Sequence, residues 1–276
     1  MESITEKQRE TWNKFSSGWQ KWDEFVLAWL KPIGDELLIK AELKNTDKVL
    51  DVSTGTGEPG LTAATKVAQV IATDVAEDMV EIARQNALNR KLTNYEVKVA
   101  DAEHLPFADN SFDAVVCRLG VMYFGNPQAG VNEMVRVLKP SRKLSLAAWA
   151  EPTKNPWATT ASSVINKLLN LPPPPSDAPG VFRHNNPGML VTMMEATGLV
   201  DTEQNEVTGE MSFNSPEQYW EFVTDVVAPV ATPLSTADTA TREQAKQAVL
   251  NATSDYSKGG KIVFNWSCWV ATGSKK

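Results

Sequence analysis

The chain has 276 residues, of which 42% are hydrophobic and 22% are charged, and its net charge at pH 7 is −7. This is the composition of an ordinary globular protein that is long enough to bury a sizeable core. The negative charge argues against a nucleic-acid-binding surface, no apolar stretch reaches the ~20 residues of a membrane span, and the first residues lack the basic-then-apolar pattern of a signal peptide.

Residues 1–44 are expected to form an N-terminal helical lid, with a helix over residues 4–44. Aromatic residues recur there at alternating steps of three and four, which places them on one face of a helix. The residues on this face are Trp12, Phe15, Trp19, Trp22, Val26 and Trp29, of which the first four are assigned to the lid. As a lid, the helix would close these side chains over a binding site and line a substrate pocket. A helix that only packs on the rest of the domain fits the same pattern.

Residues 49–60 read VLDVSTGTGEPG and join an apolar strand to a glycine-rich turn. Gly55 and Gly57 let the backbone pass close to a ligand at points where a Cβ atom would collide. The helix that follows offers free N–H groups at its start. The next apolar run ends in Asp74, where a carboxylate can accept both hydroxyls of a ribose. Nucleotide-type cofactors bind this arrangement.

Strands and helices alternate across residues 45–150. We predict strands near 47–52, 69–73, 94–99, 112–117 and 143–149, and helices near 58–67, 77–91 and 127–138. Such alternation predicts an α/β fold with a doubly wound, Rossmann-like parallel sheet. Ligands bind these sheets at the carboxyl ends of the strands, where Ser53, Asp74, Asp101 and Arg118 fall.

The pattern changes after Trp149, and residues 151–276 are expected to complete the sheet and to cap it. Helices are predicted near 157–170 and 187–197, the second ending at Gly198, and strands near 203–213 and 262–270. The prolines at 172–175 indicate a stiff surface spacer.

The glycine spacing by itself also matches the dinucleotide fingerprint, which leaves NAD open as a ligand. Three details favour S-adenosylmethionine. Asp51 in the strand tip would repel a pyrophosphate but attract the ammonium of a methionine moiety, and Pro59 removes one possible phosphate donor. Asp101-Ala102-Glu103 follows the third strand, a place where adenine is typically held.

On these residues the chain resembles the class I S-adenosylmethionine-dependent methyltransferases, in the group with small-molecule and quinone methyltransferases. The resemblance is carried by residues 51–57, Asp74, and residues 101–107, 111–116 and 136–140. The resemblance implies a seven-stranded, mostly parallel sheet with an antiparallel last strand, and residues 151–186 and 214–258 as insertions over the pocket. It also implies S-adenosylmethionine as cofactor and S-adenosylhomocysteine as product. No metal is expected, because the sequence has no Cys/His cluster at metal-ligand spacing. Ser53 and Ser141-Arg142 depart from the pattern, because the family commonly has glycine there.

The resemblance also implies roles for individual residues at the cofactor. Asp51, Ser53, Gly55, Thr56 and Gly57 would surround the methionine portion, and Asp74 would accept the ribose hydroxyls. The adenine would lie against Val75 and Met79 and meet Asp101, Ala102 and Glu103, and Arg118 would contact the methionine carboxylate. A solvated arginine at a strand end is an equally good interpretation of Arg118.

No catalytic residue is assigned from the sequence. A general base is needed only if the acceptor arrives protonated, and His104, His184 and Tyr123 are the candidates. The residues after the fourth strand, Gly120-Val121-Met122-Tyr123, replace the Gly-x-Arg-Asn element of quinone C-methyltransferases, which argues against a quinone acceptor.

We therefore expect a cytoplasmic enzyme that methylates a small, largely apolar or aromatic acceptor at O, N or C, as a monomer or homodimer. Cys117 and Cys268 fall in predicted strands and indicate reduced core residues. The cap segments are rich in apolar residues, namely Trp157, Val164, Leu168, Leu169, Phe182, Met189, Met193, Met194, Trp220 and Phe222, which line an apolar pocket or form the cap's own core. An NAD-dependent oxidoreductase and a non-catalytic S-adenosylmethionine-binding module are the alternatives.

Overall fold

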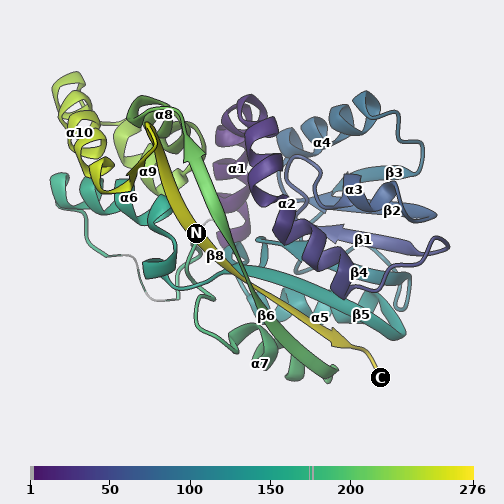
Figure 1. Cartoon of the computed structure of the whole chain (residues 1–276). Coiled ribbons are helices and arrows are strands. Elements are labelled where there is room, and N and C mark those ends of the chain that lie inside the picture. Colours follow the sequence, from purple (N-terminus) through teal and green to yellow (C-terminus); the bar gives the residue numbers. More distant parts are fainter. Residues whose placement is uncertain (1–2, 174, 176) are drawn as a thin grey trace.

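The computed structural model describes residues 3–173, 175 and 177–276, which build one twisted sheet with helices on both faces (Figure 1). The strand order is β3-β2-β1-β4-β5-β8-β6, and a two-residue strand, β7, pairs with β8. The bounds are β1 Lys48–Val52, β2 Gln69–Asp74, β3 Tyr95–Val99, β4 Phe112–Arg118, β5 Leu138–Trp149, β6 Val200–Phe213, β7 Ser257–Lys258 and β8 Lys261–Ser274. Strands β1 to β5 pair in parallel, and β8 runs antiparallel to both β5 and β6. The predicted α/β fold with an antiparallel last strand is confirmed.

Helices cover the two faces of the sheet because successive strand residues point to opposite sides. In β1, Val49 packs with Ala63 of α3, whereas Leu50 belongs to the buried cluster that contains Val131 of α5 and Leu190 of α7. One face is therefore covered by α2 (Asp23–Lys40), α3 (Gly60–Ala64) and α4 (Glu77–Asn89), and the other by α5 (Pro127–Val137) and α7 (Met189–Glu195).

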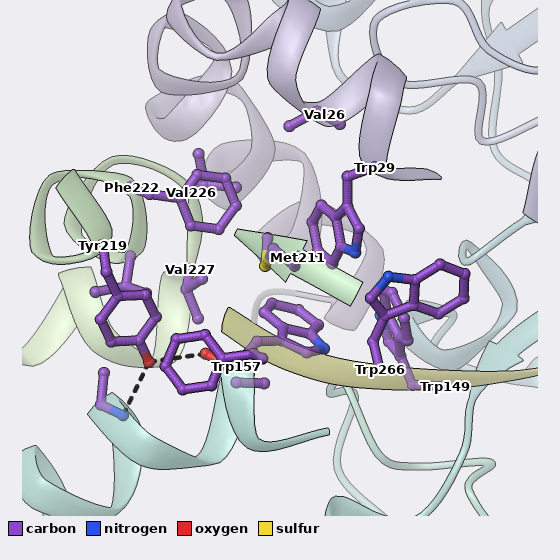
Figure 2. Close-up of a cluster of buried hydrophobic side chains, with 14 of the residues drawn as sticks. Val26, Trp29, Trp149, Trp157, Met211, Tyr219, Phe222, Val226, Val227 and Trp266 are labelled. Atoms are coloured by element: carbon purple, nitrogen blue, oxygen red, sulfur yellow. Dashed lines mark hydrogen bonds between the residues drawn. The ribbon is translucent and has the colours of Figure 1, made fainter. Parts of the chain in front are cut away.

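The remaining helices form a cap beyond the carboxyl ends of the parallel strands, alongside the outer parts of β6 and β8 (Figure 1). They are α1 (Ile4–Lys21), α6 (Pro156–Leu168), α8 (Pro216–Val226), α9 (Ala228–Ser235) and α10 (Thr239–Ala252). An aromatic core joins the cap to α2 and to strands β5, β6 and β8 (Figure 2). In it, the Tyr219 hydroxyl donates to the carbonyl of Trp157 at 2.8 Å and accepts from the N–H of Ala161 at 3.2 Å, which joins α8 to α6.

The structure differs from the sequence-based expectation in four elements, the first of which is α3, where Gly60–Ala64 replaces the helix predicted near 58–67. The predicted helix over 4–44 is two helices, α1 and α2, which meet at Trp22. Strand β5 begins at Leu138 rather than near residue 143, and Ser141 within it has a φ of 60°. Helix α7 is shorter than predicted, and both glycines that flank it, Gly188 and Gly198, have positive φ.

Among the described residues, each helix is too short or too polar to cross a bilayer. The proline segment predicted as a spacer lies partly outside the described residues, because Pro174 is not among them. Three short 3₁₀ turns complete the structure, at Val121–Tyr123, Pro152–Lys154 and Ser254–Tyr256.

Candidate functional site

A cavity of about 570 Å³ lies at the carboxyl ends of the parallel strands. Its wall follows the strand order: Asp101 comes after β3, Asp74 ends β2, Ser53 comes after β1, Arg118 ends β4, and Trp149 ends β5. Neighbouring strands are about 4.8 Å apart, so this wall extends over roughly 19 Å. The cavity is therefore an elongated site along one edge of the sheet.

Two glycines shape the loop after β1 where it borders the cavity. Gly57 has a φ of 119°, and a Cβ atom there would lie 2.5 Å from Cδ1 of Leu61. Gly55 has a φ of 57°, lines the cavity, and has open space where a Cβ would be. The loop thus takes a path that suits glycine and leaves room beside it for a bound molecule.

Asp51 supports this loop from behind and does not line the cavity. One carboxylate oxygen, Oδ2, accepts from the hydroxyl of Thr54 at 2.6 Å and from the N–H of Gly60 at 2.8 Å. The side chain is fully buried, and burial raises its pKa to about 7 against the opposing effect of these hydrogen bonds. Its position fits a structural role in the loop better than direct contact with a ligand.

Ser53 stands at a position that suits glycine, and Gly120 makes room for it. The φ of Ser53 is 58°, in the left-handed region that side chains disfavour. A Cβ atom on Gly120 would lie 2.5 Å from the Cβ of Ser53 and 2.9 Å from the Sγ of Cys117. The turn after β4 therefore packs directly against the turn after β1. The second departure from the family pattern, Ser141, also has a positive φ.

The Asp74 carboxylate is held at the tip of β2 by backbone donors. Its Oδ2 accepts from the N–H of Gly55 at 2.9 Å, and its Oδ1 accepts from the N–H of Ala76 at 3.0 Å. Burial raises the pKa of this carboxyl, while both N–H donors oppose the rise. Each oxygen can accept a further hydrogen bond, so the carboxylate is positioned to bind a pair of hydroxyls in the cavity that it lines.

The cavity end beside β3 carries the predicted adenine residues. Val75, Met79, Asp101, Ala102 and Glu103 all line it. Asp101 Oδ1 accepts from the N–H of Glu103 at 2.9 Å, which fixes the turn after β3. An apolar surface of this kind with adjacent polar edges fits a flat, hydrogen-bonding ring.

Arg118 is half-buried at the end of β4 and lines the cavity near Glu58. Its Nη1 donates to the carbonyl of Leu30 in α2 at 3.5 Å. Burial lowers the pKa of the guanidinium, and the nearby carboxylates of Glu58 and Asp51 oppose that effect. It is therefore not a solvated surface arginine.

Helix α1 roofs the cavity through Thr5, Gln8, Thr11, Trp12 and Trp19. The ring of Trp12 meets the ring of Tyr123 edge to face, with centroids 5.0 Å apart. Polar contacts hold the same helix to the β2 side: Arg9 Nε donates to the carbonyl of Val75 at 3.2 Å, and Asn13 Oδ1 accepts from the N–H of Asp78 at 3.1 Å.

Two of the four predicted lid aromatics point elsewhere. Phe15 and Trp22 are buried and do not line the cavity. The indole N–H of Trp22 donates to Asp225 Oδ2 at 2.9 Å, and its ring packs edge to face against Phe222 of the cap. The break between α1 and α2 at Trp22 turns this residue away from the roof.

The opposite end of the cavity is aromatic and lies in the buried cluster of Figure 2. Trp29 of α2 stacks on Trp149 of β5, with ring centroids 5.4 Å apart, and meets Trp157 of α6 at 4.7 Å. All three line the cavity, together with Met122, Leu171, Val181 and residues 226–229, 232 and 233. Trp29 lies on the aromatic face predicted from the sequence but was not assigned to the lid, and Trp149 was not predicted as a site residue. The only sequence signals were the continuation of the aromatic helical spacing to Trp29 and the strand end at Trp149.

Of the three candidate bases, the structure brings one to the cavity. Tyr123 lines it, and burial raises the pKa of its hydroxyl. His104 is exposed and lies 3.3 Å from Asp101 Oδ2, outside the lining. His184 is buried away from the cavity, where burial and Arg183 lower its pKa to about 4. Across the described residues, no group of three or more His, Cys, Asp or Glu side chains is arranged to hold a metal.

Comparison with known proteins finds relatives for the part of the chain that carries the parallel strands and the glycine-rich loop. Residues 49–141 match the family described as a methyltransferase domain. The uncharacterised methyltransferase YcgJ of Bacillus subtilis is 35% identical over 125 residues, covering 45% of this chain and 49% of that protein. The demethylmenaquinone methyltransferase of Renibacterium salmoninarum is 34% identical over 122 residues, covering 44% and 49%.

The matched region thus spans about half the length of these curated relatives. Among solved structures, the crystal structure of the YcgJ protein from Bacillus subtilis superposes with a TM-score of 0.59 over 89% of this chain and 98% of that chain, at 20% identity. This likeness extends the agreement in fold beyond the matched sequence.

Proposed function

We propose that this protein transfers a methyl group from S-adenosylmethionine to a small, largely apolar or aromatic acceptor. Residues 49–141 match the methyltransferase-domain family, and the fold resembles that of the YcgJ protein, which supports the proposal. The observation that carries the proposal is the elongated cavity, which has carboxylates after β2 and β3 at one end and tryptophans at the other.

The cofactor's place follows from the order of groups along the wall. Its adenine would lie beside Val75, Met79 and the turn of Asp101, and its ribose hydroxyls would bind Asp74. Its methionine portion would pass the loop of Ser53 and Gly55 toward Arg118. This order uses the cavity from β3 to β4 and directs the sulfur toward the tryptophan end.

Methyl transfer from a sulfonium is a displacement that needs alignment and exclusion of water more than covalent help from the protein. The roof of α1 and the tryptophan wall supply a dry, shaped space for this step. The acceptor end offers mainly apolar surface, which supports an apolar or aromatic acceptor. The quinone methyltransferase among the relatives acts within that class, although the Gly120–Tyr123 segment departs from the quinone-enzyme pattern.

We propose that the protein is a monomer or a homodimer. Cys117 and Cys268 are buried and unpaired, which supports a cytoplasmic location.

Titration calorimetry with S-adenosylhomocysteine tests the cofactor site. We expect a dissociation constant in the low micromolar range or tighter, about −8 kcal/mol. Asp74→Ala removes a charged hydrogen-bond acceptor and should weaken binding by roughly 100-fold. Asp78→Ala, at an exposed side chain outside the cavity, is the matched control. Unchanged affinity in Asp74→Ala would contradict the assignment of Asp74 to the cofactor's ribose hydroxyls.

Two alternative functions would give different experimental results. An NAD-dependent oxidoreductase would be stabilised by NAD and not by S-adenosylmethionine in parallel thermal-shift titrations, since a ligand at 100 times its dissociation constant adds about 2.7 kcal/mol of stability. A non-catalytic binding module would bind S-adenosylmethionine but release no S-adenosylhomocysteine with any member of a broad acceptor panel.

A further inference from the structure

The side chains that can exchange protons are distributed unevenly along the cavity. Those that line it are Glu58, Asp74, Asp101, Glu103, Arg118 and Tyr123. The four carboxylates all follow β1, β2 or β3, on the side assigned to the cofactor. From β4 onward, within the described part of the lining, Arg118 and Tyr123 are the only two groups of this kind.

The carboxylates are also engaged by neighbours at their own end of the cavity. Glu58 Oε1 accepts from Arg90 Nη1 at 2.6 Å, and Glu103 Oε1 accepts from the N–H of Asn126 at 3.0 Å. Asp74 and Asp101 bind the backbone N–H groups already described. None of them therefore lies free at the tryptophan end to take a proton from an acceptor.

Every other element around the acceptor end presents uncharged side chains to the cavity. Helix α1 contributes Thr5, Gln8, Thr11, Trp12 and Trp19, α2 contributes Trp29 and Leu30, and β5 and α6 contribute Trp149 and Trp157. The segment after α6 contributes Leu171, Pro179, Gly180 and Val181, and α8, α9 and their junction contribute residues 226–229, 232 and 233. Arg118 is the only cation among the described lining residues.

Tyr123 is suited to donate a hydrogen bond rather than to accept a proton. Its ring is fixed edge to face against Trp12, and burial keeps the pKa of its hydroxyl above the usual value. At neutral pH the hydroxyl is protonated, so an oxygen of negative charge in the cavity is the partner that it favours.

Building on the proposed function, we propose that the acceptor binds as a delocalised aromatic oxyanion, a phenolate or ring enolate, whose oxygen accepts a hydrogen bond from the Tyr123 hydroxyl. The acceptor's proton goes to solvent before the acceptor binds. An electron pair of the acceptor, either a lone pair on the oxygen or the π pair at a conjugated ring carbon, then forms the bond to the methyl carbon. The carbon–sulfur bond breaks, and its electron pair stays on sulfur. The opposite charges of acceptor and sulfonium disappear together. Methylation at carbon is followed by loss of the ring proton to water.

Spectrophotometric titration of 4-nitrophenol with the full chain tests this, because the neutral and ionised forms of this probe absorb differently. The protein is first saturated with sinefungin, an unreactive cofactor analogue that carries an amine near the position of the methyl group. We expect the bound probe to ionise at a pH at least one unit below that of the free probe, which is a tenfold preference for the phenolate. Tyr123→Phe should weaken phenolate binding at least tenfold.

Tyr256→Phe is the matched control, since Tyr256 packs on Phe264 in the cap, outside the cavity. Thermal unfolding of each variant establishes that it is folded. A probe that binds in its neutral form, that binds Tyr123→Phe equally well, or that does not bind beside sinefungin overturns the inference. None of these results contradicts the methyltransferase proposal. If neither sinefungin nor S-adenosylhomocysteine binds, however, both the methyltransferase proposal and the oxyanion inference are wrong.

A second readout uses phenol, 4-hydroxybenzaldehyde and 4-nitrophenol as acceptors of increasing acidity. The rising limb of kcat/KM with pH should move with the pKa of each acceptor. A limb at one common pH for all three would identify a protein base and contradict the inference. Product analysis distinguishes methylation of the oxygen from methylation of the ring.

Discussion

Replacing Asp51 by asparagine is expected to flatten the dependence of stability on pH. The carboxyl is fully buried, and its pKa in the folded protein is raised from 3.8 to about 7, chiefly by burial. A carboxyl with a raised pKa stays protonated in the folded protein at pH values where the unfolded chain has released the proton. Its effect on stability is thus unfavourable and grows as the pH rises from about 4 to about 7.

The size of the effect follows from the shift. About three pKa units at about 1.4 kcal/mol each give a total cost of about 4 kcal/mol above pH 7. Roughly 3 kcal/mol of this develops between pH 5 and pH 8.5. In Asp51→Asn, the amide oxygen can still accept from Thr54 and Gly60, but the titration is gone. The amide nitrogen takes the place of Oδ1, which has no hydrogen-bond partner among the described residues. The buried N–H₂ group therefore has no acceptor, and its desolvation lowers the stability of Asp51→Asn by about 1–3 kcal/mol at every pH.

Urea denaturation of both proteins at pH 5 and at pH 8.5 measures the difference. The wild type should lose roughly 3 kcal/mol more than Asp51→Asn between the two conditions. Asp78→Asn, at an exposed side chain, should follow the wild type. Equal losses in the wild type and Asp51→Asn would mean that Asp51 is ionised in the folded protein at both pH values, and the reasoning from burial would be wrong.

Two other predictions concern the turn after β4 and the roof. Gly120→Ala should destabilise the protein by about 2 kcal/mol, because the added Cβ would lie 2.5 Å from the Cβ of Ser53. In a double-mutant cycle measured by urea denaturation, adding Ser53→Gly should recover about half of this loss. Strictly additive effects of the two substitutions would contradict the contact. Deleting residues 1–21, which removes α1 but keeps the buried α2, should weaken S-adenosylhomocysteine binding by at least tenfold in calorimetry. Unchanged affinity would mean that α1 only packs on the domain.

The sheet and the glycine loop were predictable because their signals are local. Apolar runs alternating with helical periodicity predicted the parallel strands, and the residues at their ends converge because parallel strands end at one edge. Asp74, Ser53, Asp101 and Arg118 accordingly lie around one cavity. The resemblance to class I methyltransferases rested on the same residues and is confirmed.

The cap was less predictable, because periodicity shows that residues share a face but not what that face meets. Of the ten apolar cap residues expected in a pocket or a core, only Trp157 lines the cavity. Phe222 and Met194 are fully buried, in two different clusters. The aromatic series of the N-terminal segment is split in the same way at Trp22.

The sequence by itself thus determined the order of strands and helices, the path of the glycine loop and the edge of the sheet where a ligand lies, since each depends on neighbours a few residues away. Only the tertiary structure decided which aromatics face the cavity and which candidate proton acceptor reaches it. Trp29, Trp149 and Trp157 come together from α2, β5 and α6, and His184 is buried elsewhere while Tyr123 lines the wall. These outcomes depend on packing between segments more than a hundred residues apart, where burial of apolar surface selects the arrangement and local sequence patterns do not.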